Sequence, residues 1–302
     1  MKNYLITPYD NFNCIAEKCK HSCCVGWQIL IDKKTLKSYK KLNGNEKAGI
    51  DFKKSCFKLD ENKRCAFLDD EGLCKLINQY GKDALCQVCS DHPRYRNYFK
   101  GREEMGLGLT CEEACRQILT FNGKMKAVPI NDSSERLSSF ERRVLAFRED
   151  VLSIVQNRSL HINEKIEKLI AISNANLELP LSFYATWLTK IECLDKNWQE
   201  LLKKCLNNDS LITAVSVDGI LFEQLLSYFV FRHVSKAISE KELRCLLVFS
   251  LFSALMVISI HTQIGVDVLE VARLYSSEIE YSENNLNSLY EFSETILSKN
   301  CK

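Results

Sequence analysis

The residues best able to do chemistry are the cysteines in the first third of the chain. The sequence holds 15 cysteines in 302 residues, and residues 14–24, CIAEKCKHSCC, place four thiols within eleven residues. The last two are adjacent and poorly placed to bridge each other, because a disulfide requires Cα atoms about 5.5 Å apart in a specific torsion. Closely spaced thiolates can instead share one cation, whose charge offsets their repulsion and lowers their pKa values. We therefore expect a metal or iron–sulfur site here.

More thiols follow at spacings that also suit metal binding. Sulfur-rich sites suit either zinc or iron–sulfur clusters, so the pattern indicates a metal without choosing which. Structural zinc sites commonly use two CxxC pairs, and this chain has one. A zinc site that only folds the domain stays open as an alternative. The later thiols fall as Cys65-x8-Cys74, Cys86-x2-Cys89 and Cys111-x3-Cys115.

The remaining cysteines lack close cysteine neighbours of this kind. An unpaired cysteine is commonly a small, buried apolar side chain. We interpret five residues in this way: Cys56, Cys193, Cys205, Cys245 and Cys301.

Composition limits the class of protein and its compartment. Apolar residues make up 46% of the chain and the net charge is +2, so a sizeable core is available and nothing favours nucleic acid as a partner. The N-terminal residues MKNYLITPYDNF lack the basic and apolar regions of a secretory signal. We therefore expect a cytoplasmic protein with reduced thiols rather than a secreted disulfide scaffold. The longest apolar run, residues 245–260, is too short for a bilayer, which predicts a buried core helix and no membrane partner.

Local patterns predict the elements that position the early thiols. Trp27, Ile29 and Ile31 alternate along WQILID, which predicts a strand, and residues 33–42 have the periodicity of a short helix. The segment 64–76, RCAFLDDEGLCKL, predicts a hairpin that brings Cys65 and Cys74 side by side.

Two further helices are expected around later thiols. Residues 81–89 should form a short helix that ends before Pro93 and puts Cys86 and Cys89 on one face. Thr110 with Glu113 fits a capping box, which would place Cys111 at a helix N-terminus, where the dipole favours a thiolate.

The predicted fold is mainly α, in two domains without an internal repeat. Residues 1–125 should form a small, irregular, cysteine-rich metal-binding domain with minor β structure. Residues 130–302 should form an α-helical bundle, because proline and glycine become rare and helical periodicity takes over. The helices are expected at residues 134–157, 163–175, 181–206, 217–238, 240–263, 267–281 and 284–299.

The segment SDHPRYRNYF, residues 90–99, is the best candidate for contact with a substrate or cofactor. Arg94 and Arg96 can hold a carboxylate bidentately. Tyr95, Tyr98 and Trp27 can face a cationic group through cation–π contact. The alternative is that the arginines brace a loop and the aromatic rings fill a small core.

The same segment supplies the candidate catalytic residues, Asp91 and Tyr95. A general base must accept a proton from its substrate, which a carboxylate or a phenolate can do. Asp91 is placed to accept such a proton, whereas His92 before Pro93 is better interpreted as a loop residue or a spare ligand.

Taken together, four segments resemble the flagellin lysine N-methylase family, which is related to YkgJ-type cysteine-cluster zinc- or iron-chelating domains. They are CIAEKCKHSCCVGWQILID, RCAFLDDEGLCKL, LCQVCSDHPRYRN and GLGLTCEEACRQIL, and they fall within residues 8–120. The resemblance implies methyl transfer from S-adenosylmethionine to lysines of flagellin, with a [4Fe-4S] cluster held by cysteines. The Gly106-Leu-Gly108 run lacks the third glycine of a dinucleotide-binding loop, so the donor site is not located by sequence.

The resemblance also implies a set of metal-binding cysteines. Cys86 and Cys115 rank below this set, because smaller residues are usual at their positions. Eight thiols exceed the four that one cluster takes, so a second metal or spectator thiols must be allowed. The eight are Cys14, Cys19, Cys23, Cys24, Cys65, Cys74, Cys89 and Cys111.

The function expected from this resemblance is S-adenosylmethionine-dependent N-methylation of lysine side chains on flagellin, using a [4Fe-4S] cluster. The helical half would dock the protein substrate. The alternative is a non-catalytic zinc- or iron-binding module whose helices bind a partner.

Overall fold

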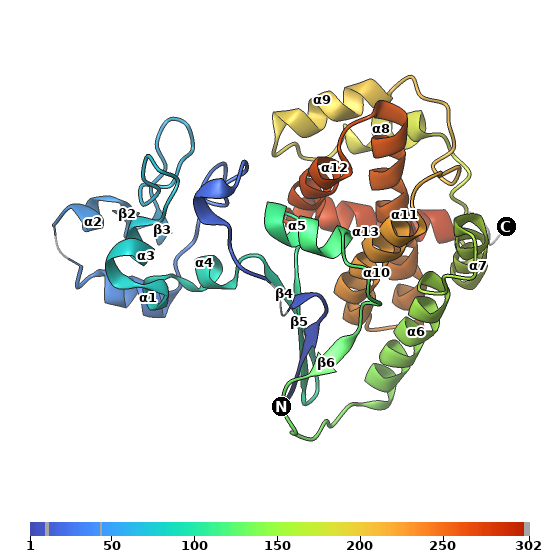
Figure 1. Ribbon diagram of the computed structural model, residues 1–302, viewed down its shortest axis with the longest axis horizontal. Helices are drawn as coiled ribbons and strands as arrows, with labels where there is room; N and C mark the ends of the chain where they lie inside the picture. Colours follow the sequence, from blue (N-terminus) through green and yellow to red (C-terminus); the bar gives the residue numbers. More distant parts are fainter. Residues whose placement is uncertain (10–11, 43, 299–302) are drawn as a thin grey trace. The chain divides into compact units, whose positions relative to one another are not determined.

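The computed structural model describes residues 1–9, 12–42 and 44–298. It confirms a mainly α protein with minor sheets (Figure 1). The chain divides into two compact units, which we call the cysteine-rich unit and the helical unit. The cysteine-rich unit comprises Asn13–Arg94 and Cys111–Glu113, and the helical unit comprises Met1–Phe12, Tyr95–Thr110 and Ala114–Lys302. The sequence predicts a single boundary between residues 125 and 130. In the structure, residues 1–12 and 95–110, which include three strands, belong instead to the helical unit.

The helical unit is built around one long helix that is apolar on all sides. In α11 (Glu240–Ile264), residues Cys245–Ile260 are all buried, as expected for a helix at the centre of a core. It is the one helix of the described chain long and apolar enough to cross a membrane, and 94% of its apolar window is buried. At its N-terminus the Ser239 hydroxyl accepts the Glu242 N–H, which caps the helix.

The helices around α11 follow the predicted periodicity, with one exception. The helix expected at 181–206 is wrong, because the chain leaves the helix at Leu188 and starts another at Lys196. Between them, the backbone N–H groups of Leu194 and Asp195 donate to the carboxylate of Glu278, contacts that a continuous helix would not allow. The observed helices are α6 (Ser139–Val155), α7 (Ile162–Ser173), α8 (Leu181–Leu188), α9 (Lys196–Cys205), α10 (Gly219–His233), α12 (Val268–Tyr275) and α13 (Glu283–Ser298), with a π-helical turn at Ser276–Glu280 after α12.

A four-stranded sheet accompanies these helices, in the order β4-β5-β1-β6. Strand β1 runs parallel to β5, with Lys2 opposite Arg102 and Leu5 opposite Met105, and antiparallel to β6. Within the segment offered for contact with a substrate or cofactor, residues 94–99 form strand β4, which explains the alternating charged and aromatic residues there. The strands are β1 (Lys2–Ile6), β4 (Arg94–Phe99), β5 (Arg102–Leu107) and β6 (Ala127–Pro129), and α5 (Glu112–Leu119) lies between β5 and β6 in the chain.

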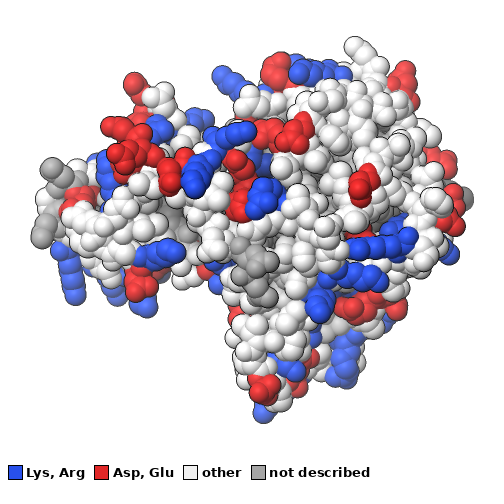
Figure 2. Space-filling view, in the orientation of Figure 1, with Lys and Arg blue, Asp and Glu red and all other residues white. Residues whose placement is uncertain are grey.

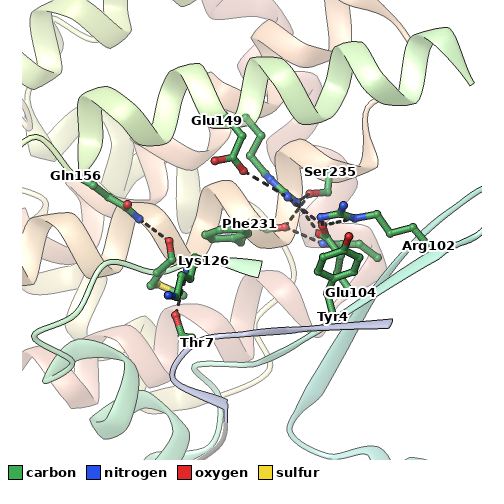
Figure 3. Close-up of polar contacts among 12 residues, drawn as sticks. Tyr4, Thr7, Arg102, Glu104, Lys126, Glu149, Gln156, Phe231 and Ser235 are labelled. Carbon is green, nitrogen blue, oxygen red and sulfur yellow. Dashed lines mark hydrogen bonds and ion pairs between the residues drawn. The ribbon is translucent and has the colours of Figure 1, made fainter. Parts of the chain in front are cut away.

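A buried carboxylate joins the sheet to helix α6. Glu104 on β5 is fully buried and accepts two hydrogen bonds from Arg102 and two from Arg148 of α6, at 2.5 and 2.9 Å in each case (Figure 3). Arg148 also donates to Ser235 at 2.8 Å. Burial raises the pKa of Glu104, but the two guanidinium groups outweigh it and hold the pKa below its usual value. The network is therefore charged and almost entirely buried.

The cysteine-rich unit is a set of short elements around a small core. Asp32 links two helices, because Oδ1 accepts the Thr35 N–H at the start of α1 and Oδ2 accepts the Gln87 N–H at the start of α4. The core contains Ile29, Ile31, Tyr39, Ile50, Phe57, Phe67 and Leu76, together with cysteines. The elements are α1 (Lys33–Tyr39), α2 (Gly44–Ala48), β2 (Ile50–Asp51), β3 (Cys56–Phe57), α3 (Lys75–Tyr80) and α4 (Gln87–Asp91), with 3₁₀ turns at Ala16–Lys18 and Lys82–Ala84.

Several local predictions for this unit are confirmed and others are wrong. The helix at 33–42 forms, and α4 ends before Pro93. The strand predicted at WQILID is reduced to a single bridge between Leu30 and Cys56. Ile29 and Ile31 are buried, but Trp27 is 38% exposed, so the three do not share one face. The helix predicted at 81–89 starts later, since residues 82–84 form a 3₁₀ turn first.

The first prediction concerns the buried ion pair. Replacing Arg148 by Ala should lower the free energy of unfolding by about 3–5 kcal/mol, because the Glu104 carboxylate is left buried with one cation fewer. Arg143 lies on the same helix and pairs with Glu240 at the surface, so Arg143→Ala should cost no more than about 1 kcal/mol. Urea unfolding followed by circular dichroism measures both, and equal losses would contradict this assignment.

Candidate functional site

The cysteine-rich unit contains ten thiols, and every described cysteine of the chain is free. All eight cysteines implied by the family resemblance lie in this unit, whereas Cys115 lies in the helical unit. Cys301 lies outside the described residues. The ten are Cys14, Cys19, Cys23, Cys24, Cys56, Cys65, Cys74, Cys86, Cys89 and Cys111.

Two of these thiols end a pair of matching loops that sequence reasoning missed. Asp60 accepts backbone N–H groups from residues 62 and 64, and Asp69 accepts those of residues 71 and 73. Each loop passes through a positive φ, 57° at Lys63 and 80° at Gly72. Each closes with a bridge to a cysteine, Leu59 to Cys65 and Leu68 to Cys74. The repeat period is nine residues.

The same loops carry the acidic surface of the unit. Figure 2 shows acidic side chains gathered over the loops beside β2 and β3, and basic ones around α1. Glu61, Asp70 and Glu71 are exposed at the loop tips, while Asp60 and Asp69 fold back onto the backbone. The signal that identifies the repeat is Leu-Asp followed five residues after the aspartate by cysteine, at 59–65 and again at 68–74.

The first group of thiols is formed by Cys14, Cys19, Cys23 and Cys111. Glu112 holds the two parts of the chain together, because its Oε2 accepts the N–H of Lys20 at 2.8 Å and that of His21 at 3.3 Å. The pKa of the Cys19 thiol is raised to about 12. Burial is the largest cause, and the neighbouring Cys111 and Cys14 thiols also contribute. Cys111 precedes the first residue of α5, as the sequence predicts.

The second group consists of Cys24, Cys65, Cys74, Cys86 and Cys89, which pack in or against the small core. The Cys65 N–H donates to the Cys24 carbonyl at 2.8 Å, which fixes these two residues side by side. Burial raises the pKa of Cys65 to about 11, with further contributions from Cys24, Cys74 and Cys86. Sequence reasoning ranked Cys86 low, yet it is completely buried and contacts Cys89, which its i, i+3 spacing indicated.

Two pairs of thiols each share a proton; the first pair has one member in each group, and the second pair lies within the second group. Cys23 donates a hydrogen bond to Cys24, which lowers the pKa of Cys24 to about 7 and raises that of Cys23. Cys89 donates to Cys86 in the same way, lowering the pKa of Cys86 to about 7. One member of each pair is therefore prepared to act as a thiolate, the form that binds metal.

Thiol sulfur is a suitable ligand for a soft metal, but the present side-chain positions do not form a coordination site. Among the described residues, no group of three or more His, Cys, Asp or Glu side chains is arranged to hold a metal ion as they lie. The thiols of each group nevertheless interact electrostatically and belong to one unit. Coordination would require their side chains to turn toward a common centre, which rotation about χ1 of cysteine permits.

The other candidate residues have protein partners. Arg94 Nη1 donates to the carbonyl oxygens of Ser90 and His92, both at 3.3 Å. Arg96 pairs with Glu103 at 3.0 Å across the β4–β5 hairpin. These contacts match the bracing alternative for the two arginines.

Trp27 and the candidate catalytic residues are also placed by the structure. The Trp27 indole donates to the Cys23 carbonyl at 2.9 Å, so its ring lies beside the first thiol group. Asp91 Oδ2 accepts the Gln87 side-chain amide at 2.6 Å. Burial raises the pKa of Tyr95 above its usual value, so its phenol stays protonated and is unsuited to act as a base. Burial lowers the pKa of His92 to about 4.

Comparison with known proteins gives the chain its relatives. It is 31% identical over 134 residues to the flagellar biosynthetic protein FliU of Salmonella muenchen, a match that covers 39% of this chain and 79% of that protein. The chain belongs to the flagellin lysine N-methylase family. It is also 31% identical over 136 residues to the lysine-N-methylase of Salmonella choleraesuis and over 134 residues to that of Salmonella typhimurium, with 39% of this chain matched in each case. The matches span about a third (33%) of the length of those two enzymes. No family model and no solved structure matches the chain.

The second prediction tests the shared proton of this family member's adjacent thiols. In reduced, metal-free protein, iodoacetamide should modify Cys24 faster than Cys74 at pH 7, because the hydrogen bond from Cys23 lowers the pKa of Cys24 to about 7, whereas burial raises the pKa of Cys74. Both side chains are half-buried, so access is comparable. Mass spectrometry of timed samples gives the two rates.

The matched control removes the hydrogen-bond donor. Cys23→Ala should raise the pKa of Cys24 and slow its modification at pH 7 toward the rate of Cys74. If Cys24 reacts no faster than Cys74 in the native sequence, the shared-proton assignment is wrong.

Proposed function

We propose that this chain takes part in S-adenosylmethionine-dependent N-methylation of lysine side chains on flagellin, in the cytoplasm. The single observation that carries the proposal is the gathering of ten free thiols in one unit of a chain that belongs to the flagellin lysine N-methylase family. The names of the curated relatives refer to lysine N-methylation and to flagellar biosynthesis.

The metal component of the proposal is a [4Fe-4S] cluster. Four cysteine thiolates hold such a cluster, and each thiol group offers at least four. Cys14, Cys19, Cys23 and Cys111 would serve one site, and Cys24 with Cys65, Cys74, Cys86 and Cys89 would serve the other. The cluster would supply a charged, redox-active centre. Cys56 is set apart from both groups, because its sulfur accepts a hydrogen bond from the Gln28 amide at 3.1 Å and it is buried beside β2.

The proposed reaction transfers one methyl group and releases one proton. The target lysine loses a proton, its neutral nitrogen forms a bond to the methyl carbon, and the bond from that carbon to sulfur breaks with its electrons remaining on sulfur. The products are a methylated lysine and S-adenosylhomocysteine. In this reaction the protein would orient the two reactants and accept the proton. Asp91 is the better of the two candidate bases, because the Tyr95 phenol is held protonated by burial.

The exposed carboxylates of the matching loops support a cationic protein substrate. Glu61, Asp70 and Glu71 form an acidic surface in the unit that holds the thiols (Figure 2). Opposite charge raises the encounter rate of a lysine-bearing segment with such a surface.

A second candidate function is favoured by the way the thiols enter the core. Five cysteines pack with Ile29, Phe57 and Leu76, as they would in a domain that zinc folds without catalysis. In that case the chain is a zinc- or iron-binding module, and its helical unit binds a partner protein.

The third prediction distinguishes the two functions. Protein purified without oxygen should contain iron with matching acid-labile sulfide and should transfer labelled methyl groups from S-adenosylmethionine to flagellin lysines. Colourless protein with zinc alone, and no transfer to flagellin, would support the module instead.

Cysteine variants locate the metal within the same experiment. Replacing Cys23 and Cys24 together by Ser should remove most of the bound metal and abolish transfer, because one thiol is lost from each group. Cys193 is exposed in the helical unit, so Cys193→Ser should leave both metal content and transfer unchanged. Full metal content in the double variant would contradict the proposed ligands.

A further inference from the structure

The helical unit contains a buried arginine whose hydrogen-bonding capacity is only partly used. Arg232 on α10 is 8% exposed, and a guanidinium has five N–H donors. Nη1 donates to the Tyr228 hydroxyl at 2.6 Å, and Nε lies 3.1 Å from Glu280 Oε1 without the geometry of a hydrogen bond. Among the described residues, Nη2 has no hydrogen-bond partner. One edge of the guanidinium therefore stays open.

Glu280 lies beside this guanidinium and is itself held in place by three hydrogen bonds. Its carboxylate accepts hydrogen bonds from Tyr228 at 2.7 Å, Ser276 at 2.5 Å and His233 at 2.6 Å. Its position depends on the π-helical turn Ser276–Glu280, and turns of this rare type occur frequently at functional sites. Three of the carboxylate's roughly four lone-pair sites are therefore used by these donors, and Nε of Arg232 lies beside Oε1.

Three tyrosine rings surround the guanidinium carbon of Arg232. Their centroids lie 5.4 Å away for Tyr95, 5.9 Å for Tyr228 and 5.2 Å for Tyr281. The Tyr95 ring lies against Gly106, where a Cβ atom would come within 2.4 Å of it, so this position of β5 requires glycine. Tyr281 is 43% exposed, which places the accessible side of the cluster at its ring.

The charged groups of the cluster sum to a net positive charge. Arg232 is balanced by Glu280, and His233 is neutral because burial lowers its pKa to about 3. Lys236 supplies a further positive charge. Burial and then the Arg232 charge lower its pKa to about 8, although the side chain as a whole is exposed. The carboxylate of a ligand is therefore attracted to the cluster.

We propose that the open edge of Arg232 binds the carboxylate of the amino-acid end of the methyl donor, with Tyr281 beside the aliphatic chain. A carboxylate matches a guanidinium edge bidentately, and tyrosine rings provide the apolar faces that methylene groups require. This inference rests on the proposed function, since it names the part of the protein that holds S-adenosylmethionine. It also assigns a role to Gly106 and Tyr95, because together they shape one wall of the site.

The fourth prediction uses two nucleosides that differ at the carboxylate. S-adenosylhomocysteine carries the amino-acid group, whereas 5′-methylthioadenosine lacks it. By calorimetric titration of the full chain, Arg232→Gln should weaken S-adenosylhomocysteine binding at least about tenfold and leave 5′-methylthioadenosine binding unchanged. The control is Arg158→Gln, which removes an arginine paired with Glu223 on the same helix α10 and should change neither affinity.

The outcomes separate this inference from the proposed function. If Arg232→Gln binds S-adenosylhomocysteine as tightly as the native chain, the carboxylate site is wrong while donor use stands. If the native chain binds neither nucleoside, both proposals fall. Should Arg232→Gln not fold, Arg232→Lys keeps the charge but loses the fork, and it must show the same selective loss.

Discussion

The crowding of sulfur in a small unit is the constraint on which the rest of the structure depends. Ten thiols share the cysteine-rich unit with a core of few large apolar side chains, and five of the ten lie in or against that core. Such a core supplies limited hydrophobic stabilisation. Bonds between several thiolates and one metal would add folding free energy where the core is smallest. The adjacent and i, i+3 pairs already share protons, which lowers the cost of forming thiolates.

The helical unit is organised around buried charges as well as apolar packing. Glu104 joins β5 to α6, and Glu280 joins the π-helical turn to α10. Each carboxylate is completely buried and holds an arginine, but the two arginines differ in what they leave open. Arg148 is 1% exposed and enclosed by protein, whereas Arg232 keeps a free edge beside an exposed tyrosine. That difference is the physical basis for assigning a structural role to the first and a binding role to the second.

The features that sequence predicts here are local ones. The cysteine spacings, the helix at residues 33–42 and the all-apolar helix α11 depend on neighbours within a few residues, and each is recognisable from pattern alone. The helix break before Lys196 depends on Glu278, some eighty residues away, so no local signal reveals it. Sequence predicts Tyr95 as a possible base, but the residues that surround it, Gly106 and Arg232, come from distant segments that local pattern does not reveal. Burial raises the pKa of its phenol, which therefore stays protonated and cannot accept a proton. The nine-residue loop repeat is present in the sequence, but a polar segment with aspartate and glycine is typical of any turn. The repeat is therefore recognised only once the aspartate-to-backbone hydrogen bonds are seen.

The most direct test of the central claim is X-ray absorption spectroscopy at the metal edge of protein purified without oxygen. The account predicts a first shell of sulfur atoms at about 2.3 Å, with iron neighbours if the metal is held in a cluster. A first shell dominated by oxygen or nitrogen, or protein that folds fully with no bound metal, would contradict it.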